Sequence, residues 1–502
     1  MFRDRSDLLA DDDDVRGYGV AVTPGPDGPF VFVAGYGEPN RLYTREDGRF
    51  VDTACGIVAD GDRHGMGVCA ADVDGDGCEE LYVHNCASYA GLTGDSDLLL
   101  DRLESDRYRW TDVFALEVNA DRLNFRAGRS VAALDRLGTG RYGFAIAGYG
   151  APVAFYELGR DGEASDLAPA IGLDVAGGCR SLLPGPIVSD RTDLFVSLEN
   201  ASNRLFRNEN GQYVPVELDP ALADPDGDAR GVALVDDGTG FAIVLGNWEG
   251  ESRLCRRDGA GEFVDVAPES LASARSVRSV IAVDFDNDGR EELFCNQLGE
   301  PNHLLERVDP LDPDAGVTDT FDTSDRWVSV DVGDAAEPDG FGTGAIAADL
   351  NGDGALELLV VHGEVAAQPI SVYAVSDASE RDWVRVRPTT AAGAPARGAV
   401  VRLETTRGVQ RRVIDAGAGY LRHTIGRSQA RDRSDPAAIG TAGVTSSGDR
   451  GAVGPPRDRT ARLRCADRTS DIGPSRHGRR PAGPRRHDRY RSGTYRFNRS
   501  GT

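Results

Sequence analysis

The stretch that decides the fold reads Val283-Asp284-Phe285-Asp286-Asn287-Asp288-Gly289-Arg290-Glu291-Glu292-Leu293-Phe294. Three aspartates alternate with other residues, a glycine follows them, and Glu292 closes the pattern at its ninth position. Carboxylates two residues apart repel one another strongly unless a cation lies between them. Gly289 permits the sharp turn that wraps backbone carbonyls around such a cation. We therefore interpret the stretch as a cation-binding loop, against the alternative of a bare Asp-rich surface turn.

The pattern occurs twice more, which weakens the alternative of a bare turn. The two further copies are Asp72-Val73-Asp74-Gly75-Asp76-Gly77-Cys78-Glu79-Glu80-Leu81 and Asp349-Leu350-Asn351-Gly352-Asp353-Gly354-Ala355-Leu356-Glu357-Leu358. In every copy Asp or Asn occupies positions 1, 3 and 5, glycine position 6, and glutamate position 9. We predict that at least one copy binds a divalent cation, and the hard oxygen ligands favour Ca²⁺.

An EF-hand shares the first six positions of this pattern. It also requires a bidentate glutamate at position 12 and a helix on either side. Position 12 is instead Val83, Cys295 or Val360, each inside an apolar, strand-like run. The pattern therefore indicates calcium loops in β-hairpins and excludes EF-hands.

Internal repeats indicate the architecture of the chain. Apolar runs that we interpret as the second strand of each repeat recur at roughly 50-residue intervals, which is typical of a four-stranded propeller blade. These runs are Phe30 to Val33, Leu81 to Val83, Phe144 to Ile146, Leu194 to Val196, Ala242 to Val244, Leu293 to Cys295 and Leu358 to Val360. Asn40, Asn203, Ser252 and Asn302 mark the start of the runs that we interpret as third strands. The sequence therefore predicts an all-β, seven-bladed propeller.

The repeat around Asp284 resembles the FG-GAP/VCBS repeat found in integrin α-chain propellers. Beyond the seventh blade, Trp383 to Val386, Gly398 to Leu403 and Arg412 to Leu421 resemble the ASPIC/UnbV segment, which accompanies such propellers in the cartilage acidic protein family. The resemblance covers about residues 15 to 421. It implies about three Ca²⁺ sites, with ligands Asp72, Asp74, Asp76 and Glu80; Asp284, Asp286, Asp288 and Glu292; and Asp349, Asn351, Asp353 and Glu357.

The resemblance stops after residue 422, where Arg422-His423-Thr424-Ile425-Gly426 replaces the run that the family continues with. Residues 423–502 contain eighteen Arg, seven Asp and no Glu, and they lack apolar periodicity. We therefore predict four parts: an acidic N-terminal segment (1–14), the propeller (15–380), an incomplete ASPIC/UnbV-like segment (381–422) and a disordered tail (423–502). A reading-frame shift near residue 422 is our first explanation of the tail. Natural disorder and a nucleic-acid-binding arm are the alternatives.

Composition limits the partners and the habitat. The chain has 502 residues and a formal net charge of −26, and all 56 of its basic residues are arginine. An acidic chain without lysine suggests a halophile, and its folded part is not expected to bind nucleic acid. Residues 1–15 contain neither an apolar core nor a twin arginine, so we expect a cytoplasmic protein without a membrane span. An extracellular location is the alternative if the start codon is misassigned.

Catalytic motifs find little support. His64, His84, His303 and His362 are scattered over separate repeats, and none forms a nucleophile motif with a neighbouring Ser or Cys. The eight cysteines lack CxxC spacing, so zinc is not expected. We predict a monomeric, noncatalytic, calcium-stabilised propeller that binds a protein or a glycan. The alternative is a polysaccharide-active lyase or hydrolase with its site in the central channel.

Overall fold

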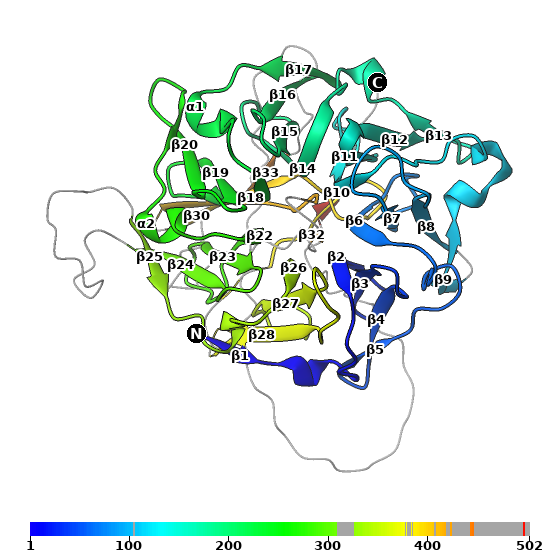
Figure 1. Ribbon diagram of the computed structural model, residues 1–502, viewed down its shortest axis with the longest axis horizontal. Helices are drawn as coiled ribbons and strands as arrows, with labels where there is room; N and C mark the ends of the chain where they lie inside the picture. Colours follow the sequence, from blue (N-terminus) through cyan, green and yellow to red (C-terminus); the bar gives the residue numbers. More distant parts are fainter. Residues whose placement is uncertain are drawn as a thin grey trace, which may run out of the picture.

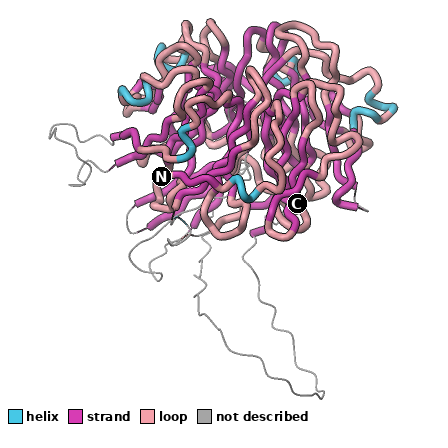
Figure 2. Tube along the Cα trace, turned by 60° about the horizontal axis from the view of Figure 1, so that its bottom comes forward, coloured by secondary structure: helices cyan, strands magenta, loops and turns pink. Residues whose placement is uncertain are grey.

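The computed structural model describes residues 1–502 apart from 104–105, 309–325, 377, 379–382, 384, 406–407, 418–421, 424–441, 446–494 and 497–502. Strands dominate the described chain and surround a common centre (Figure 1). Figure 2 shows only short helical turns between them. These are α1 (Pro220–Ala223), α2 (Glu269–Ala272), η1 (Ser6–Leu8), η2 (Val113–Ala115), η3 (Glu117–Asn119), η4 (Pro169–Ile171) and η5 (Asp334–Ala336). Within the described residues, no helix is long and apolar enough to span a bilayer. The prediction of an all-β propeller is confirmed.

The ring consists of antiparallel four-stranded sheets, which we number as blades in chain order and in which the strands run from the centre outward. Blade 1 comprises β2 (Gly17–Pro24), β3 (Pro29–Gly35), β4 (Arg41–Glu46) and β5 (Arg49–Asp52), and blade 2 comprises β6 (Gly65–Ala71), β7 (Glu80–Asn85), β8 (Leu98–Leu103) and β9 (Asp106–Asp112). Blade 3 comprises β10 (Gly128–Leu134), β11 (Gly143–Pro152), β12 (Ala154–Leu158) and β13 (Ala164–Asp166). Blade 4 comprises β14 (Ala176–Gly185), β15 (Asp193–Leu198), β16 (Arg204–Glu209) and β17 (Gln212–Val216). Blade 5 comprises β18 (Ala229–Asp236), β19 (Phe241–Asn247), β20 (Arg253–Arg257) and β21 (Phe263–Asp265). Blade 6 comprises β22 (Val277–Val283), β23 (Glu292–Gln297), β24 (His303–Val308) and β25 (Arg326–Val330). Blade 7 comprises β26 (Gly342–Ala348), β27 (Glu357–His362) and β28 (Ser371–Val375), with β1 (Phe2–Asp4) as its outermost strand. Every apolar run predicted as a second strand lies in the second strand of its blade.

The hydrophobic core lies between neighbouring blades. Innermost strands such as β6, β10 and β26 are buried along their whole length, because side chains on both faces of each blade meet the next blade. Glycine lets these strands approach at the centre. A Cβ at Gly67 would lie 2.2 Å from the carbonyl oxygen of Arg129 in the next blade. This close approach explains why the inner strands are rich in glycine and alanine rather than in larger residues.

The ring closes through the first strand of the chain. β1 pairs antiparallel with β28, with Phe2 opposite Val375 and Asp4 opposite Tyr373. Phe2 is fully buried, and its ring centroid lies 4.9 Å from that of Phe285. Arg16 to Val22 does not pair beside the last blade near residues 370 to 375, because residues 17–24 form β2, which pairs with β3 in blade 1. The strand that closes the ring is β1, so the N-terminal segment (1–14) that the sequence separated from the propeller contributes a strand to it. Phe2 is the one buried residue of β1, and a single apolar residue beside charged ones does not indicate a strand in the sequence.

Beyond blade 7 the chain crosses one face of the ring. We call residues 385–417 the cap segment; it contains β29 (Pro388–Thr389), β30 (Val400–Thr405) and β31 (Gly408–Val413). β30 pairs with β31 and with β33 (Ala442–Thr445), and both β30 and β33 lie across the centre in Figure 1. β32 (Arg422–His423) runs parallel to β2, and β34 (Tyr495–Arg496) runs parallel to β29. The remainder of the predicted tail lies outside the described residues, where disorder and a frameshift stay predictions.

A buried side chain at the start of the third strand fastens several blades, and we call it the clip residue. Asn40, Asn203 and Asn302 each accept a hydrogen bond from the backbone amide that ends the second strand, at 2.8, 3.0 and 2.8 Å. Each amide side chain also donates to a backbone carbonyl that precedes the next blade, at 3.0 Å in all three. Ser252 does the same with its hydroxyl. These two hydrogen bonds explain why an asparagine precedes the third strand in blades 1, 4 and 6.

Candidate metal centres

The three Asp-rich loops join the first and second strands of blades 2, 6 and 7, so all three lie on the same face of the ring. Each contains a residue in the left-handed region at the turn: φ is 91° at Gly77, 95° at Gly289 and 94° at Gly354. Glycine adopts this backbone without strain, which fulfils the role that the sequence assigned to position 6. The glutamate at position 9 is the first residue of the second strand in each loop.

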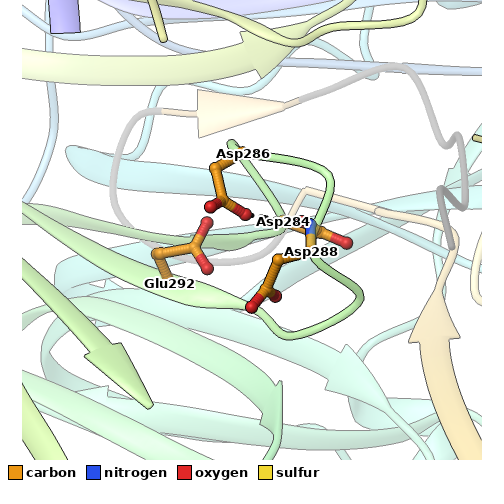
Figure 3. A group of neighbouring side chains, drawn as sticks. All are labelled: Asp284, Asp286, Asp288 and Glu292. Atoms are coloured by element: carbon orange, nitrogen blue, oxygen red, sulfur yellow. Dashed lines mark hydrogen bonds between the residues drawn. The ribbon is translucent and has the colours of Figure 1, made fainter. Parts of the chain in front are cut away.

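The loop of blade 6 gathers all four predicted ligands. One oxygen from each of Asp284, Asp286, Asp288 and Glu292 lies within 4.8 Å of the others (Figure 3). Backbone amides hold the carboxylates in place: Asp288 donates to both Asp284 and Asp286 at 2.9 Å, and Phe285 donates to Glu292 at 2.7 Å. Such a set of hard oxygen donors suits Ca²⁺.

The electrostatics of this loop favour a cation. Burial raises the pKa of Asp284 to about 8, partly opposed by the Arg412 guanidinium and reinforced by the charges of Asp288 and Asp286. Burial also raises the pKa of Glu292 well above its ordinary value, and the three aspartates add to the effect. Asp284 and Glu292 are only 2% and 4% exposed. Four clustered carboxylates can therefore all be ionised only beside additional positive charge.

The loop of blade 2 gathers three of its four predicted ligands: Asp72, Asp74 and Glu80. Asp76 is exposed and accepts a hydrogen bond from the Cys78 amide at 2.6 Å. Burial raises the pKa of Asp72 to about 6 and that of Glu80 well above its ordinary value. Among the described residues, Glu80 Oε1 has no hydrogen-bond partner, so a lone pair inside the loop is left for another ligand.

The loop of blade 7 has a different arrangement. Its acids Asp349, Asp353 and Glu357 do not form a comparable oxygen cluster within the described chain. Asn351 Nδ2 donates to Glu357 Oε1 at 2.6 Å and to Asp353 Oδ2 at 3.2 Å. Asp349 forms an ion pair with Arg385 of the cap segment. The positive charge at this loop comes from the protein itself.

Sequence reasoning missed the residue at position 8, just before the closing glutamate. In blade 2 this is Glu79, which accepts from Arg397 Nε at 2.6 Å and Nη2 at 2.8 Å; both side chains are at most 1% exposed. In blade 6 it is Glu291, whose Oε1 lies 3.4 Å from Arg412 Nε. Blade 7 has Leu356 there, and its loop meets Arg385 through Asp349 instead. The Glu-Glu pairs were the available signal: one glutamate faces the loop and the other anchors the cap segment.

Further contacts seat the cap segment over this face. Arg411 donates from its backbone amide to Asp236 Oδ2 of blade 5 at 2.6 Å. Arg412 Nη2 donates to the carbonyl of Gly289 at 3.2 Å, and the Ala133 amide donates to the carbonyl of Ala416 at 2.8 Å. The cap segment therefore touches the Asp-rich loops themselves. A groove of about 520 Å³ remains beside the blade 2 loop, bordered by Asp74, Asp101, Arg141, Arg160 and Thr390.

Comparison with known proteins agrees with this architecture. The model of the FG-GAP-like repeat matches residues 237–295, which include the blade 6 loop. Cartilage acidic protein 1 of Xenopus tropicalis is 39% identical over 442 residues, covering 80% of this chain and 66% of the relative. The Homo sapiens protein is 38% identical over 450 residues, covering 80% and 65%. This chain is homologous to cartilage acidic protein 1. It spans slightly less than two thirds of the length of these cartilage acidic protein 1 relatives.

Two solved structures align with most of this chain. The BP39L lectin from Burkholderia pseudomallei aligns with a TM-score of 0.44 and 13% identity, covering 72% of this chain and 97% of the lectin. YCF48 bound to D1 peptide aligns with a TM-score of 0.42 and 11% identity, covering 73% and 95%.

Proposed function

We propose that this protein is a calcium-stabilised, noncatalytic propeller that acts as a binding module for a protein or a glycan. The observation that carries the calcium part is the blade 6 cluster, where two almost fully buried carboxylates, Asp284 and Glu292, lie beside two further acids. Burying unpaired charges of one sign is strongly unfavourable, and a divalent cation relieves it. The blade 2 loop offers the same chemistry through Asp72, Asp74 and Glu80.

When bound, Ca²⁺ would supply the charge that lets these carboxylates ionise together. Arg412 already connects the blade 6 loop to the cap segment. Its guanidinium lies 3.8 Å from Asp284 Oδ2 and 3.4 Å from Glu291 Oε1. Stabilising the blade 6 loop would therefore also stabilise the cap segment against the ring. We assign Ca²⁺ a structural role for this reason.

The opposite face of the ring is the face that we propose for ligand binding. Large apolar side chains are exposed there in loops that join second to third strands or one blade to the next. Tyr89 and Leu92 are 67% and 74% exposed, and Phe125 in the adjoining loop is 41% exposed. The Thr93 amide donates to the carbonyl of Phe125 at 2.8 Å, so these side chains belong to neighbouring loops. Adjoining exposed apolar side chains are typical of a binding surface.

The polysaccharide-active enzyme gains less support. The carboxylates with the largest rises in pKa, Asp284, Glu292 and Glu80, lie in the Asp-rich loops, where metal binding explains them. The relatives carry the name of an acidic cartilage protein rather than of an enzyme. We therefore keep the noncatalytic binding module as the single candidate.

The test measures calcium and ligand binding separately. Calorimetry of chelated protein with millimolar Ca²⁺ should give heat and a raised melting temperature; no heat and no shift would refute the calcium part. Capture of matrix proteins and glycans should then be compared between wild type and Leu92→Ser with Tyr89→Ser. Val264→Ser, an exposed residue on an outer strand, is the matched control. Equal capture by all three proteins would refute the binding face.

A further inference from the structure

Blade 2 departs from the other blades at its clip residue. Where blades 1, 4 and 6 use a neutral asparagine, blade 2 has Asp97, which is 1% exposed. Asp97 still accepts from the backbone amide at the end of the second strand, that of Asn85, at 2.9 Å. It additionally accepts from His84 Nδ1 at 2.9 Å, from the Tyr82 hydroxyl at 2.6 Å and from Asn124 Nδ2 at 2.7 Å. Fastening the blade requires no charge, so the buried carboxylate points to a further role.

The partner of that carboxylate is a completely buried imidazole. His84 is 0% exposed, and its Nδ1 atom is held by Asp97. Its other nitrogen, Nε2, makes no hydrogen bond to any residue that the structure describes. A Cβ at Gly128 would lie 2.8 Å from Nε2, so glycine is required beside the ring. Cys86 follows the end of β7 by one residue, and the side chain of His84 is near enough to act on its thiol, because hydrogen bonding to His84 and the charge of His84 both lower the pKa of Cys86.

Cys86 also contacts a buried arginine. Arg129 Nη1 donates to its Sγ atom at 3.5 Å, and only the protonated form of the thiol can donate to the carbonyl of Ser88, which lies 3.0 Å from Sγ. Arg129 is 5% exposed and lies against the rings of Tyr89 and Tyr149, at 5.6 and 4.8 Å from their centroids. Its other hydrogen bonds go to the carbonyls of Gly128 and Tyr89. None of these contacts within the described chain is with a carboxylate, so Cys86 is the one partner that can supply a negative charge.

The remaining buried thiols provide the contrast. Burial raises the pKa of Cys179, Cys255 and Cys295 to about 12 and that of Cys69 well above its ordinary value. At Cys86 burial acts in the same direction, but the imidazole of His84 and the guanidinium of Arg129 outweigh it and lower the pKa of the thiol. Burial raises the pKa of the Tyr36 hydroxyl, the charge of Cys86 adds to the rise, and the charges of Arg16 and Arg129 oppose it. The groups that lower the pKa of the thiol are therefore His84, Arg129 and the Gly128 backbone amide, with Asp97 behind His84.

We propose that Cys86 is a reactive thiolate that small hydroperoxides oxidise, with Asp97 and His84 as its proton relay and Arg129 as its counter-cation. Cys86 is 1% exposed, so the reagent must be small. The sulfur would attack one peroxide oxygen, forming an S–O bond while the O–O bond breaks. The leaving oxygen takes the proton of His84 Nε2, giving a sulfenic acid, neutral imidazole and an alcohol or water. Sulfur loses two electrons and the peroxide gains them.

The experiment uses the full chain with hydrogen peroxide and a sulfenic-acid trap, and mass spectrometry measures the modification of each cysteine. Cys55 is exposed and serves as the internal control. The thiolate fraction of an ordinary exposed thiol rises about tenfold per pH unit below its pKa of about 8.5. We therefore expect the ratio of Cys86 to Cys55 oxidation rates to exceed ten at pH 6 and to fall as the pH approaches 8.5. A ratio below one at every pH would overturn the proposal.

Asp97→Asn tests the relay, because it installs the clip residue of blades 1, 4 and 6; circular dichroism and the melting temperature first establish that the variant is folded. We expect it to slow Cys86 oxidation at least tenfold while the Cys55 rate is unchanged. Equal Cys86 rates in Asp97→Asn and wild type would contradict the relay. Thiolate absorbance near 240 nm, compared between wild type and Cys86→Ser, reads the charge on sulfur independently of peroxide access. Absence of a thiolate difference at neutral pH would also overturn the proposal.

Discussion

The loops of blades 6 and 7 share one sequence pattern but differ in how their negative charge is balanced. In blade 6 four acids gather around one centre, and Arg412 of the cap segment reaches Asp284 only at 3.8 Å because Glu291 and Gly289 hold its guanidinium. In blade 7 position 8 is Leu356, and Arg385 pairs directly with Asp349. The difference teaches that the glutamate at position 8 keeps the arginine of the cap segment beside the loop rather than inside it. A cation can then occupy the loop.

The largest effect should come from breaking the anchor that this glutamate provides. Arg397→Leu leaves Glu79 buried without its charged partner, and removing one member of a buried ion pair costs about 3–5 kcal/mol. Denaturant unfolding should show this loss of stability. Arg402→Leu is the control, because Arg402 and Glu404 form an exposed pair with side chains 52% and 44% exposed, and such pairs contribute about 0–1 kcal/mol. Similar losses in both variants would contradict the anchoring role of Glu79.

The next effect concerns calcium itself. A ligand that binds only the folded state at a hundredfold excess over its Kd adds about 2.7 kcal/mol per site. We expect two such sites, in blades 2 and 6, and Asp286→Ala should remove one of them. Calorimetric stoichiometry and the melting temperature with and without chelator measure both quantities. Asp353→Ala in blade 7 should leave the stoichiometry unchanged, and a loss of binding there would undo the contrast between the loops.

A substitution at Arg385 should convert one kind of loop into the other. Arg385→Gln removes the charge that pairs with buried Asp349, which should cost about 1–3 kcal/mol in chelated buffer. Calcium should restore this loss, and the stoichiometry should rise by one. Arg387→Gln, an exposed neighbour, is the matched variant. A variant that loses stability but gains no calcium response would show that Asn351 and Leu356 prevent binding by themselves.

The last effect is gradual in pH, and it concerns a buried pair within blade 2, His84 and Asp97. Burial disfavours the imidazolium, but the carboxylate of Asp97 outweighs it and raises the pKa of His84 to about 10. A raised pKa in the folded state means that this stabilisation is complete below about 6.5, the unfolded value, and is lost as the pH rises through about 10. The loss should not exceed about 1.4 kcal/mol per pH unit. Melting curves of wild type should fall relative to His84→Gln over this window, and parallel curves would contradict it.

Much of the fold could be predicted from sequence because its signals are local. The apolar runs, the Asp-rich turns and the Asn residues at the third strands each act within one blade, and they repeat. The contacts that sequence reasoning missed join residues far apart in the chain. Glu79 and Arg397 are one example, and Phe2 with Val375 is another. No periodicity in the sequence indicates which distant residues will pair, and the sequence does not distinguish an arginine that will be buried from one that will be exposed.

The pairing of β1 with β28 also has a consequence for synthesis. Asp4 lies opposite Tyr373, so the first strand leaves the ribosome long before its partner exists. At about 5–20 residues per second, the interval is roughly 20–75 seconds. During that time Phe2 has no blade to enter, and the growing ring presents two open edges, which are prone to pairing with other chains. The nascent protein should therefore depend on chaperones until β28 emerges, whereas a circular permutant beginning at β2 and ending with β1 would complete every blade in order.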